Sequence, residues 1–442
     1  MTMKKVIAFT LVILLALGGM VWTHAAVTAE QEQLTFYPTL EIGDPSVLNG
    51  LTVSTPMKCG SHLRWTPHHT FGGDTVTEFA YSRKPLPTAL EYRGSMDVDL
   101  SASTDGSYHK IFYPITAPTP PGTSTTQTME LSEQLSQYEI DCFIDYRDGT
   151  SKCDSYNAGF TLSLLLESTF RFPVREGDTV TIEASRDPDG QLSEYFNLKN
   201  GLSLFSVCDV NAEGIWFLLD FYDKDGVRPY ESPEGHGIYH IPWKPDDLQP
   251  EQSDLIEIIP NVDELELSVP LEAGPRNEAL LADPERNLIH LLTLEDGMYV
   301  LSTYDMDSGT QSARLELLPQ DPDRGTYCTI YRHLGDQLLL YIQGHLILTD
   351  AAGETLLLTA PNPKNQNFNV ANFNPETYDL YFDGETLFIA GFYSSRPYSF
   401  AITAWSEGAQ TYYGEYSCTL TEGNENWYYS PVELTDLTLK GG

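Results

Sequence analysis

Residues 279–318, ALLADPERNLIHLLTLEDGMYVLSTYDMDSGTQSARLELL, decide the fold class of this chain. Runs of Leu, Ile, Val, Tyr and Thr alternate there with short segments that contain Asp, Pro and Gly. The first kind of run favours strands and the second favours turns. The pattern therefore predicts an antiparallel meander of four consecutive strands, over residues 279–282, 288–294, 298–304 and 311–318.

The same four-strand pattern returns over residues 326–359 and again over residues 378–418. A single sheet of this size hides both apolar faces from water only by stacking on neighbouring sheets. The strand count and the repeat length of about 50 residues resemble the β-propeller superfamily, without the WD or Kelch signature residues. The resemblance implies an all-β fold, a β-propeller of seven or eight four-stranded blades over residues 30–440.

The pattern is less regular upstream of these repeats. Residues 202–209 and 215–222 predict a further blade, and residues 162–172 with 178–185 predict a strand pair. Strands are also indicated between residues 51 and 113, where the turns are longer and the period is lost.

Two segments interrupt the strand pattern. Residues 114–128, rich in Pro and Thr, and residues 228–252, rich in Pro, Glu and Gly, predict long surface loops. The first loop allows an alternative division, with a small N-terminal β-domain before a shorter propeller. An amphipathic helix is predicted only for residues 129–138.

The first residues of the chain predict export. Lys4 and Lys5 precede an uncharged, apolar stretch over residues 6–22, and small residues follow at Ala25 and Ala29. This is the order of a signal peptide, and the stretch also reaches the lower limit for a membrane anchor. We expect residues 1–29 to be a signal peptide or N-terminal membrane anchor. The remainder of the chain, residues 30–440, is then extracytoplasmic, either secreted or held at the plasma membrane.

Net charge excludes one class of partner. The chain carries 63 acidic and 25 basic residues, a formal charge of -38. Nucleic-acid binding depends on Lys and Arg that displace counterions, so we expect no nucleic-acid partner. The same excess predicts contact with a membrane only through the N-terminal segment. It fits solvation of an exported protein or attraction of cations such as Ca²⁺.

Six cysteines in an exported chain permit disulfides. A hairpin turning at residues 146–149 would place Cys142 opposite Cys153, which predicts a bond between these two. No CxxC motif is present, which weakens a zinc or thiol-redox interpretation.

Asp-x-Asp steps near a Gly recur along the chain, and two of them, Asp223 with Asp225 and Asp305 with Asp307, are candidate Ca²⁺ ligands. They resemble the calcium loops of integrin-type propellers but lack the full ligand set. Asp and Gly are also preferred in tight hairpin turns, which is the favoured interpretation. No other cofactor is expected.

Histidines gather in two places. His62, His68 and His69 surround a Trp-Thr-Pro segment, and His236 and His240 follow Glu234. Imidazoles this close can bind a transition metal, but adjacent residues of a strand point to opposite faces. Gly and Pro around the second group exclude the helix of an HExxH zinc site. Core or surface histidines are the default interpretation for both.

Tryptophans beside loop-like, acidic segments are candidate sugar-binding residues, because aromatic rings stack on sugars: Trp65, Trp243 and Trp405. Carboxylates beside such rings can also hydrolyse glycosidic bonds. Motifs for serine hydrolases, P-loops, dinucleotide sites, HExxH zinc sites and EF-hands are absent, so a non-enzyme is favoured.

Three functions remain open. The first is an extracytoplasmic binding or scaffolding protein of the cell envelope, with a protein or glycan as ligand. The second is a glycan-active or other hydrolase with carboxylates at the propeller channel, and the third is a cation-stabilised surface module.

Overall fold

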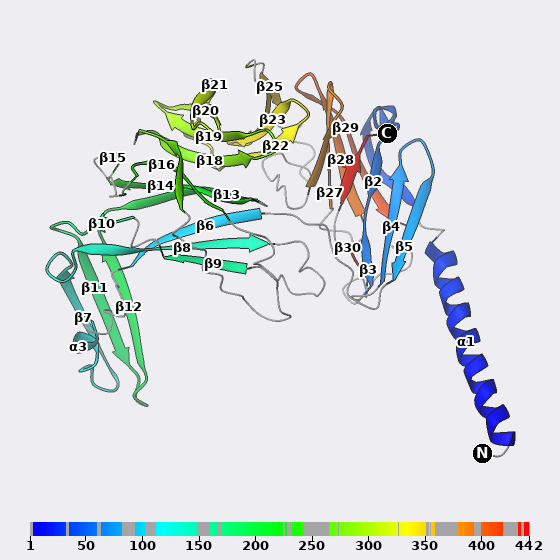
Figure 1. Ribbon diagram of the computed structural model, residues 1–442, viewed down its shortest axis with the longest axis horizontal. Helices are drawn as coiled ribbons and strands as arrows, with labels where there is room; N and C mark the ends of the chain where they lie inside the picture. Colours follow the sequence, from blue (N-terminus) through cyan, green and yellow to red (C-terminus); the bar gives the residue numbers. More distant parts are fainter. Residues whose placement is uncertain are drawn as a thin grey trace. The chain divides into compact units, whose positions relative to one another are not determined.

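The chain folds into two compact units, one of residues 1–87 and 331–442 and the other of residues 88–330. The described part of each consists mainly of antiparallel strands (Figure 1), which confirms the predicted all-β class with four-stranded sheets. The computed structural model describes residues 3–31, 35–59, 63–81, 93–101, 112–147, 160–165, 170–211, 213–223, 226–227, 232, 234–242, 265–272, 274–325, 327–350, 353, 355–358, 378–392, 399–418, 432–434 and 437–441.

The sequence that predicts the fold forms one four-stranded meander in the second unit, with the order β18-β19-β20-β21. Each predicted strand is present and extends its predicted range by at most a few residues. Tight turns between the strands include Asp296 and Gly297, which both have positive φ. The strands are β18 (Arg276–Asp283), β19 (Leu288–Glu295), β20 (Met298–Asp305) and β21 (Gln311–Pro319).

The two repeats that follow are also meanders, in the orders β22-β23-β24-β25 and β26-β27-β28-β29. The boundary between the two units falls inside β22. All eight strands lie within the two predicted segments, residues 326–359 and 378–418: β22 (Cys328–Leu334), β23 (Gln337–Ile342), β24 (His345–Thr349), β25 (Thr355–Leu358), β26 (Tyr378–Phe382), β27 (Thr386–Phe392), β28 (Ser399–Ser406) and β29 (Ala409–Cys418).

Strands distant in sequence complete two sheets of the first unit. β1 (Phe36–Gly43) pairs with β29 and so adds a fifth strand to the last meander. Conversely, two C-terminal strands join the N-terminal sheet: β31 (Thr438–Lys440) pairs with β2 (Thr52–Ser54), and β30 (Val432–Leu434) pairs with β3 (Met57–Cys59). The sheet of β2 and β3 also contains β4 (Leu63–Thr70) and β5 (Thr75–Tyr81).

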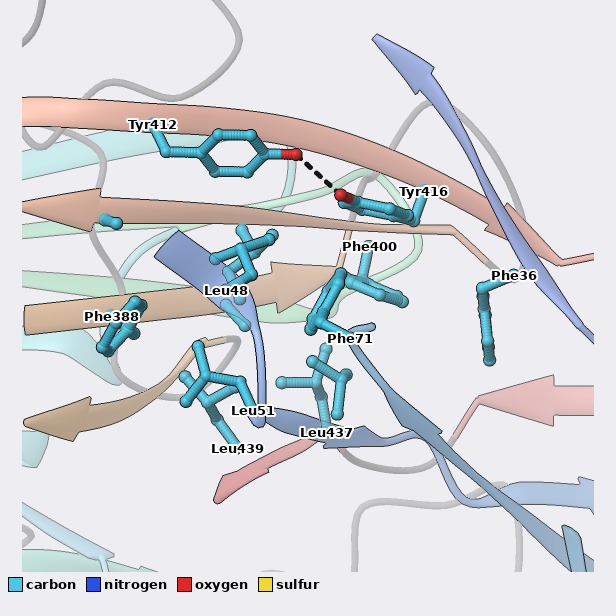
Figure 2. Packing of buried hydrophobic residues seen from close by; sticks show 14 of the residues in the cluster. Phe36, Leu48, Leu51, Phe71, Phe388, Phe400, Tyr412, Tyr416, Leu437 and Leu439 are labelled. Atoms are coloured by element: carbon cyan, nitrogen blue, oxygen red, sulfur yellow. Dashed lines mark hydrogen bonds between the residues drawn. The ribbon is translucent and has the colours of Figure 1, made fainter. Parts of the chain in front are cut away.

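An aromatic core fills the space beneath these exchanged strands (Figure 2). Phe36 of β1 packs edge-on against Phe400, and Phe400 stacks on Tyr416 with ring centroids 5.3 Å apart. The hydroxyls of Tyr412 and Tyr416 lie 2.6 Å apart, and both donate to the carboxylate of Glu41 on β1. The core and this polar contact hold β1 against the meander.

The second unit holds three further sheets. Its central sheet has the order β13-β14-β16-β17, with β15 beside β14. The others have the orders β12-β11-β7 and β10-β8-β6, with β9 beside β8. The strands are β6 (Arg93–Ser101), β7 (Thr123–Glu130), β8 (Gln137–Arg147), β9 (Phe160–Leu165), β10 (Phe172–Pro173), β11 (Thr179–Arg186), β12 (Leu192–Lys199), β13 (Ser203–Asn211), β14 (Gly214–Asp223), β15 (Gly226–Val227), β16 (Gly237–Pro242) and β17 (Glu266–Pro270).

Helices are few in the described part of the chain. They are α1 (Met3–Gln31), the 3-10 helix η1 (Pro45–Leu48) and the short helix α3 (Tyr113–Thr116). No helix among the described residues combines the length and the apolar character that crossing a membrane requires. The apolar side chains of α1 between Leu11 and Trp22 are exposed, Leu15 at 75% and Trp22 at 74%.

Several upstream predictions were wrong. The segment at residues 129–138 is no helix but the end of β7, a turn and the start of β8. The predicted loop at residues 114–128 contains α3 and most of β7. Its Thr side chains suit a strand that pairs with β11 along its whole length. The second predicted loop includes the strand β16, and its remainder lies mostly outside the described residues.

The predicted pairing of residues 162–172 with 178–185 was also wrong. Strands do form there, but β9 pairs with β8, β10 pairs with β8, and β11 pairs with β7 and β12. The two predicted segments do not pair with each other, because β9 pairs with the preceding strand β8 and β11 forms a hairpin with the following strand β12.

Candidate functional site

The candidate site lies in the second unit, where the β18–β21 sheet meets the β13–β17 sheet. Trp216 and Leu218 of β14 and Ile238 of β16 pack there against Leu280 and Leu291. This apolar contact covers only part of the β18–β21 face. Beyond it, the same face continues with polar side chains, which leaves a recess lined by polar groups.

The recess is a pocket of about 330 Å³, within the range of small-molecule sites. Asn277, Thr293 and Ser302 are buried at 3–5% exposure and form polar parts of its wall, whereas Gln311 and Arg314 are exposed. Its lining residues are His236, Leu271, Glu272, Pro275, Asn277, Leu291, Thr293, Glu295, Ser302, Tyr304, Gln311 and Arg314.

A buried carboxylate orients two of the lining side chains. Asp220 of β14 is 2% exposed, and its Oδ1 lies 3.0 Å from Nε2 of His236. Its other oxygen accepts a hydrogen bond from the side-chain amide of Asn277. A carboxylate oxygen accepts hydrogen bonds, so the pairing turns Nε2 of His236 and the amide nitrogen of Asn277 toward Asp220. The orientation of both groups is thereby fixed.

A second polar group belongs to the β18–β21 sheet alone. Arg314 of β21 donates to Oε2 of Glu295 on β19 at 2.7 Å, and Thr293 donates to Oε1 at 2.8 Å. Partial burial opposes ionisation of Glu295. The hydrogen bonds from Arg314 and Thr293 and the Arg314 charge outweigh burial and lower the pKa of Glu295 below its ordinary value. Glu295 is therefore a fixed carboxylate at the pocket wall.

The amide of Gln311 completes the polar lining. Its Nε2 donates to Oγ of Ser302 at 3.1 Å. Tyr304 contributes its ring beside Ser302, and burial raises the pKa of the Tyr304 hydroxyl. That hydroxyl therefore stays protonated at neutral pH.

The predicted sugar-binding tryptophans do not line this pocket. Trp405 is 1% exposed and packs in the core beneath β27 and β28, so its prediction as an exposed stacking platform was wrong. Aromatic residues of an apolar strand are usually core. Trp65 lies on β4, and its side chain is not among those described. Trp243 lies outside the described residues, so both stay predictions.

The Asp-x-Asp loops form turns where they are described. Oδ1 of Asp305 accepts from the backbone N–H and the hydroxyl of Ser308, while the amide of Asn287 reaches both Asp305 and Asp307. Among the described residues, no three His, Cys, Asp or Glu side chains gather as metal ligands would. Asp225 and the side chain of Asp223 lie outside the described residues, and a Ca²⁺ site there stays a prediction.

The histidine groups are divided by the fold. Nδ1 of His68 lies 2.6 Å from the hydroxyl of Ser54, and Nδ1 of His69 lies 2.9 Å from that of Thr75. His240 stacks on Trp216 and contacts Glu266, away from Asp220. Among the described histidines of both groups, His236 is the one that lines the pocket.

The tight hairpin predicted after Cys142 is not formed. Cys142 faces Val98 on β6 and Leu164 on β9 across the sheet, and β9 begins well beyond residue 153. Cys153 lies outside the described residues, so the disulfide itself stays a prediction.

Most pocket residues were missed because their local sequence shows strands and nothing else. Asp220 had a usable signal, since it is a single charged residue inside the apolar run of residues 215–221. A lone carboxylate in a buried strand needs a partner, and such a residue is a candidate for function.

Fold and site together define an all-β protein of repeated four-stranded sheets with a pocket lined largely by polar side chains. No family model and no curated protein matches the chain.

Solved β-propeller structures are similar in fold at low scores. Apo AztD from Citrobacter koseri is 8% identical with a TM-score of 0.28, covering 89% of this chain and 98% of that one. TolB from Acinetobacter baumannii is 10% identical with a TM-score of 0.24, covering 88% and 82%. A gluconolactonase from Xanthomonas campestris is 12% identical with a TM-score of 0.23, covering 75% and 98%.

Proposed function

We propose that this chain is an extracytoplasmic binding protein of the cell envelope that holds a small polar ligand in the pocket of its second unit. The observation that carries the proposal is that the polar lining is paired before any ligand arrives. Asp220 fixes His236 and Asn277, Arg314 fixes Glu295, and Ser302 fixes Gln311. A site whose side chains are already oriented loses little conformational entropy on binding.

The same pairing argues for binding over hydrolysis. A glycosidase needs a carboxylic acid that stays protonated near neutral pH, which requires a raised pKa. Glu295 has a lowered pKa instead, because Arg314 and Thr293 stabilise its charged form more than burial opposes it. Arg314 and Thr293 thus keep it as a stationary hydrogen-bond acceptor.

The N-terminal segment supports the proposed location. Residues 6–22 carry no charge, and the described apolar side chains of α1 are exposed. Exposed apolar surface of this kind is stabilised by lipid or by the export machinery. Residues 1–29 then act as a signal peptide or anchor and place the pocket outside the cytoplasm.

Thermal unfolding of the full chain in the presence of a library of small polar solutes tests the proposal. A true ligand at about 100 times its Kd adds about 2.7 kcal/mol of stability and raises the Tm. Glu295→Gln, which frees Arg314, should abolish the shift. Glu285→Gln removes the same charge from an exposed turn of the same sheet and should preserve it.

Two results would contradict the proposal. One is a library without any stabilising solute, and the other is a shift that Glu295→Gln leaves intact. Release of a chemically altered solute would favour a hydrolase instead.

A further inference from the structure

We propose that the ligand of this pocket is a neutral sugar ring, either free or at the end of a glycan. This inference rests on the proposed function and names the ligand class for the same site. It follows from three properties of the lining: its amphipathic character, its charge and its free hydrogen-bonding atoms.

The lining is amphipathic. Leu271, Pro275, Leu291 and the ring of Tyr304 provide apolar surface, while the other lining residues are polar. A pyranose has the same division, because its C–H groups form apolar patches and its hydroxyls form a polar rim. Tyr304 is 9% exposed and so offers a ring edge within the wall and not an open platform.

The charges of the lining disfavour ionic ligands. Both oxygens of Glu295 are occupied, and Arg314 lies between Glu295 and Glu316, at 2.7 Å and 3.5 Å. Arg314 is therefore already neutralised, and an anion would meet repulsion from Glu272 and Glu316. A cation would be attracted by Glu272 and Glu316, but both are exposed to solvent, where an ion pair contributes little. A neutral ligand suits this balance best.

The pocket atoms that can still form hydrogen bonds match the hydroxyl groups of a sugar. Asn277 commits its amide nitrogen to Asp220, and Gln311 commits its amide nitrogen to Ser302 and the Ala313 carbonyl. The side-chain oxygen of each amide has no hydrogen bond within the described chain and can accept one. The guanidinium of Arg314 has five N–H groups and keeps donors beyond its two ion pairs. A sugar hydroxyl both donates and accepts, so neighbouring hydroxyls can satisfy both kinds of atom.

Calorimetric titration of the full chain tests the inference. The probes are glucose, galactose, mannose and N-acetylglucosamine as neutral sugars, glucosamine as a cation, glucuronate as an anion and Gly-Gly-Gly as a neutral peptide. We expect at least one neutral sugar to bind more tightly than every charged or peptide probe. The methyl glycosides of the binding sugar separate the two sources, since a glycan-end site tolerates the methyl group and a site for the free sugar rejects one anomer or both.

Gln311→Met keeps the side-chain length and removes the free amide oxygen, so the affinity for that sugar should fall roughly three- to tenfold. Gln191→Met makes the same change in an exposed turn of the same unit and should leave the affinity unchanged. Tighter binding of glucosamine, glucuronate or Gly-Gly-Gly would overturn the inference, as would an affinity that Gln311→Met does not alter.

Failure of the sugar inference is distinguishable from failure of the proposed function. If no sugar binds but another solute stabilises the chain in a manner that depends on Glu295, only the ligand class is wrong. If no solute of either kind binds, both proposals fail together.

Discussion

Asp220 orients two side chains of a pocket that no local sequence motif indicates. Its carboxylate is buried among apolar neighbours and contacts His236 from the segment before β16 and Asn277 from β18. Leaving such a charge without partners would cost several kcal/mol, so the two partners and the carboxylate stabilise one another. The spatial meeting of these residues depends on strand pairing across distant parts of the chain, which a single sequence does not contain.

Asp209 of β13 gives stability a specific dependence on pH. Burial raises the pKa of Asp209 to about 6, and the nearby charge of Asp283 adds to this, against hydrogen bonds from Ala282, Val210 and Asn211. The folded state therefore binds this proton more tightly than the unfolded state, in which the pKa is near 3.8. The stabilisation is complete below about pH 4 and is lost as pH rises through about 6.

We expect Asp209→Asn to remove this dependence. One pKa unit corresponds to about 1.4 kcal/mol, so the wild-type protein should lose up to about 3 kcal/mol relative to the variant between pH 4 and pH 7. Urea unfolding at several pH values measures the difference. Asp296→Asn, in an exposed hairpin turn of the same unit, is the control for loss of a charge. A wild-type-minus-variant difference that stays constant with pH would contradict the assignment.

At the scale of elements, β1 is held by backbone geometry that only glycine supplies. Gly43 ends the strand with φ +99°, and a Cβ at this position would overlap the carbonyl oxygen of Thr411 on the neighbouring strand β29. Gly50 has a similar φ of +89°, but a Cβ there would meet no atom. The two glycines separate the cost of the dihedral angle from the cost of the close approach.

Both Ala substitutions should destabilise the chain, and Gly43→Ala should cost more. A positive φ costs alanine about 1–2 kcal/mol at either site. The overlap with Thr411 adds about 1–3 kcal/mol at residue 43 alone. The urea midpoints of the two full-length variants provide the measurement. Equal midpoints would show that β1 adjusts without penalty.

The strands also show how much of the fold can be predicted from the sequence. The strands of residues 279–318 and of the two following repeats were predictable, because alternating strand and turn residues specify local meanders. Residues 129–138 and the pairings of β9 and β11 were not, because the polar residues of 129–138 also fit a helix pattern and a single sequence does not show which neighbouring strand each strand pairs with. Among the residues that line the pocket, the sequence pattern indicated His236 alone, as a possible metal ligand.

At the scale of the whole molecule, the chain has two parts that favour different surroundings, the apolar segment of α1 and the acidic remainder. The described apolar side chains of α1 are exposed, whereas the net charge of -38 keeps the remainder in water. An arginine at the centre of an apolar segment opposes insertion into lipid by about 2.5 kcal/mol or more.

Leu15→Arg should therefore keep the chain inside the cell, while Gln31→Arg, at the end of the helix, should not. Fractionation of expressing cells measures this. The intact mass of the exported wild-type protein shows whether it is cut after Ala25 or Ala29 or remains whole. Identical distribution of wild-type protein and Leu15→Arg would contradict an export role for this segment.

The strand exchange of the first unit has a consequence for biosynthesis. β1 is made long before β29, and β2 and β3 long before β31 and β30. Until residues 409–440 leave the ribosome, β1 therefore lacks its partner strand, and β2 and β3 can pair only with β4. Until then they present unpaired edges that can associate with other chains. A nascent chain that cannot close early remains competent for threading through a translocon. Premature termination then yields a product with two open sheets, which proteases can recognise and remove.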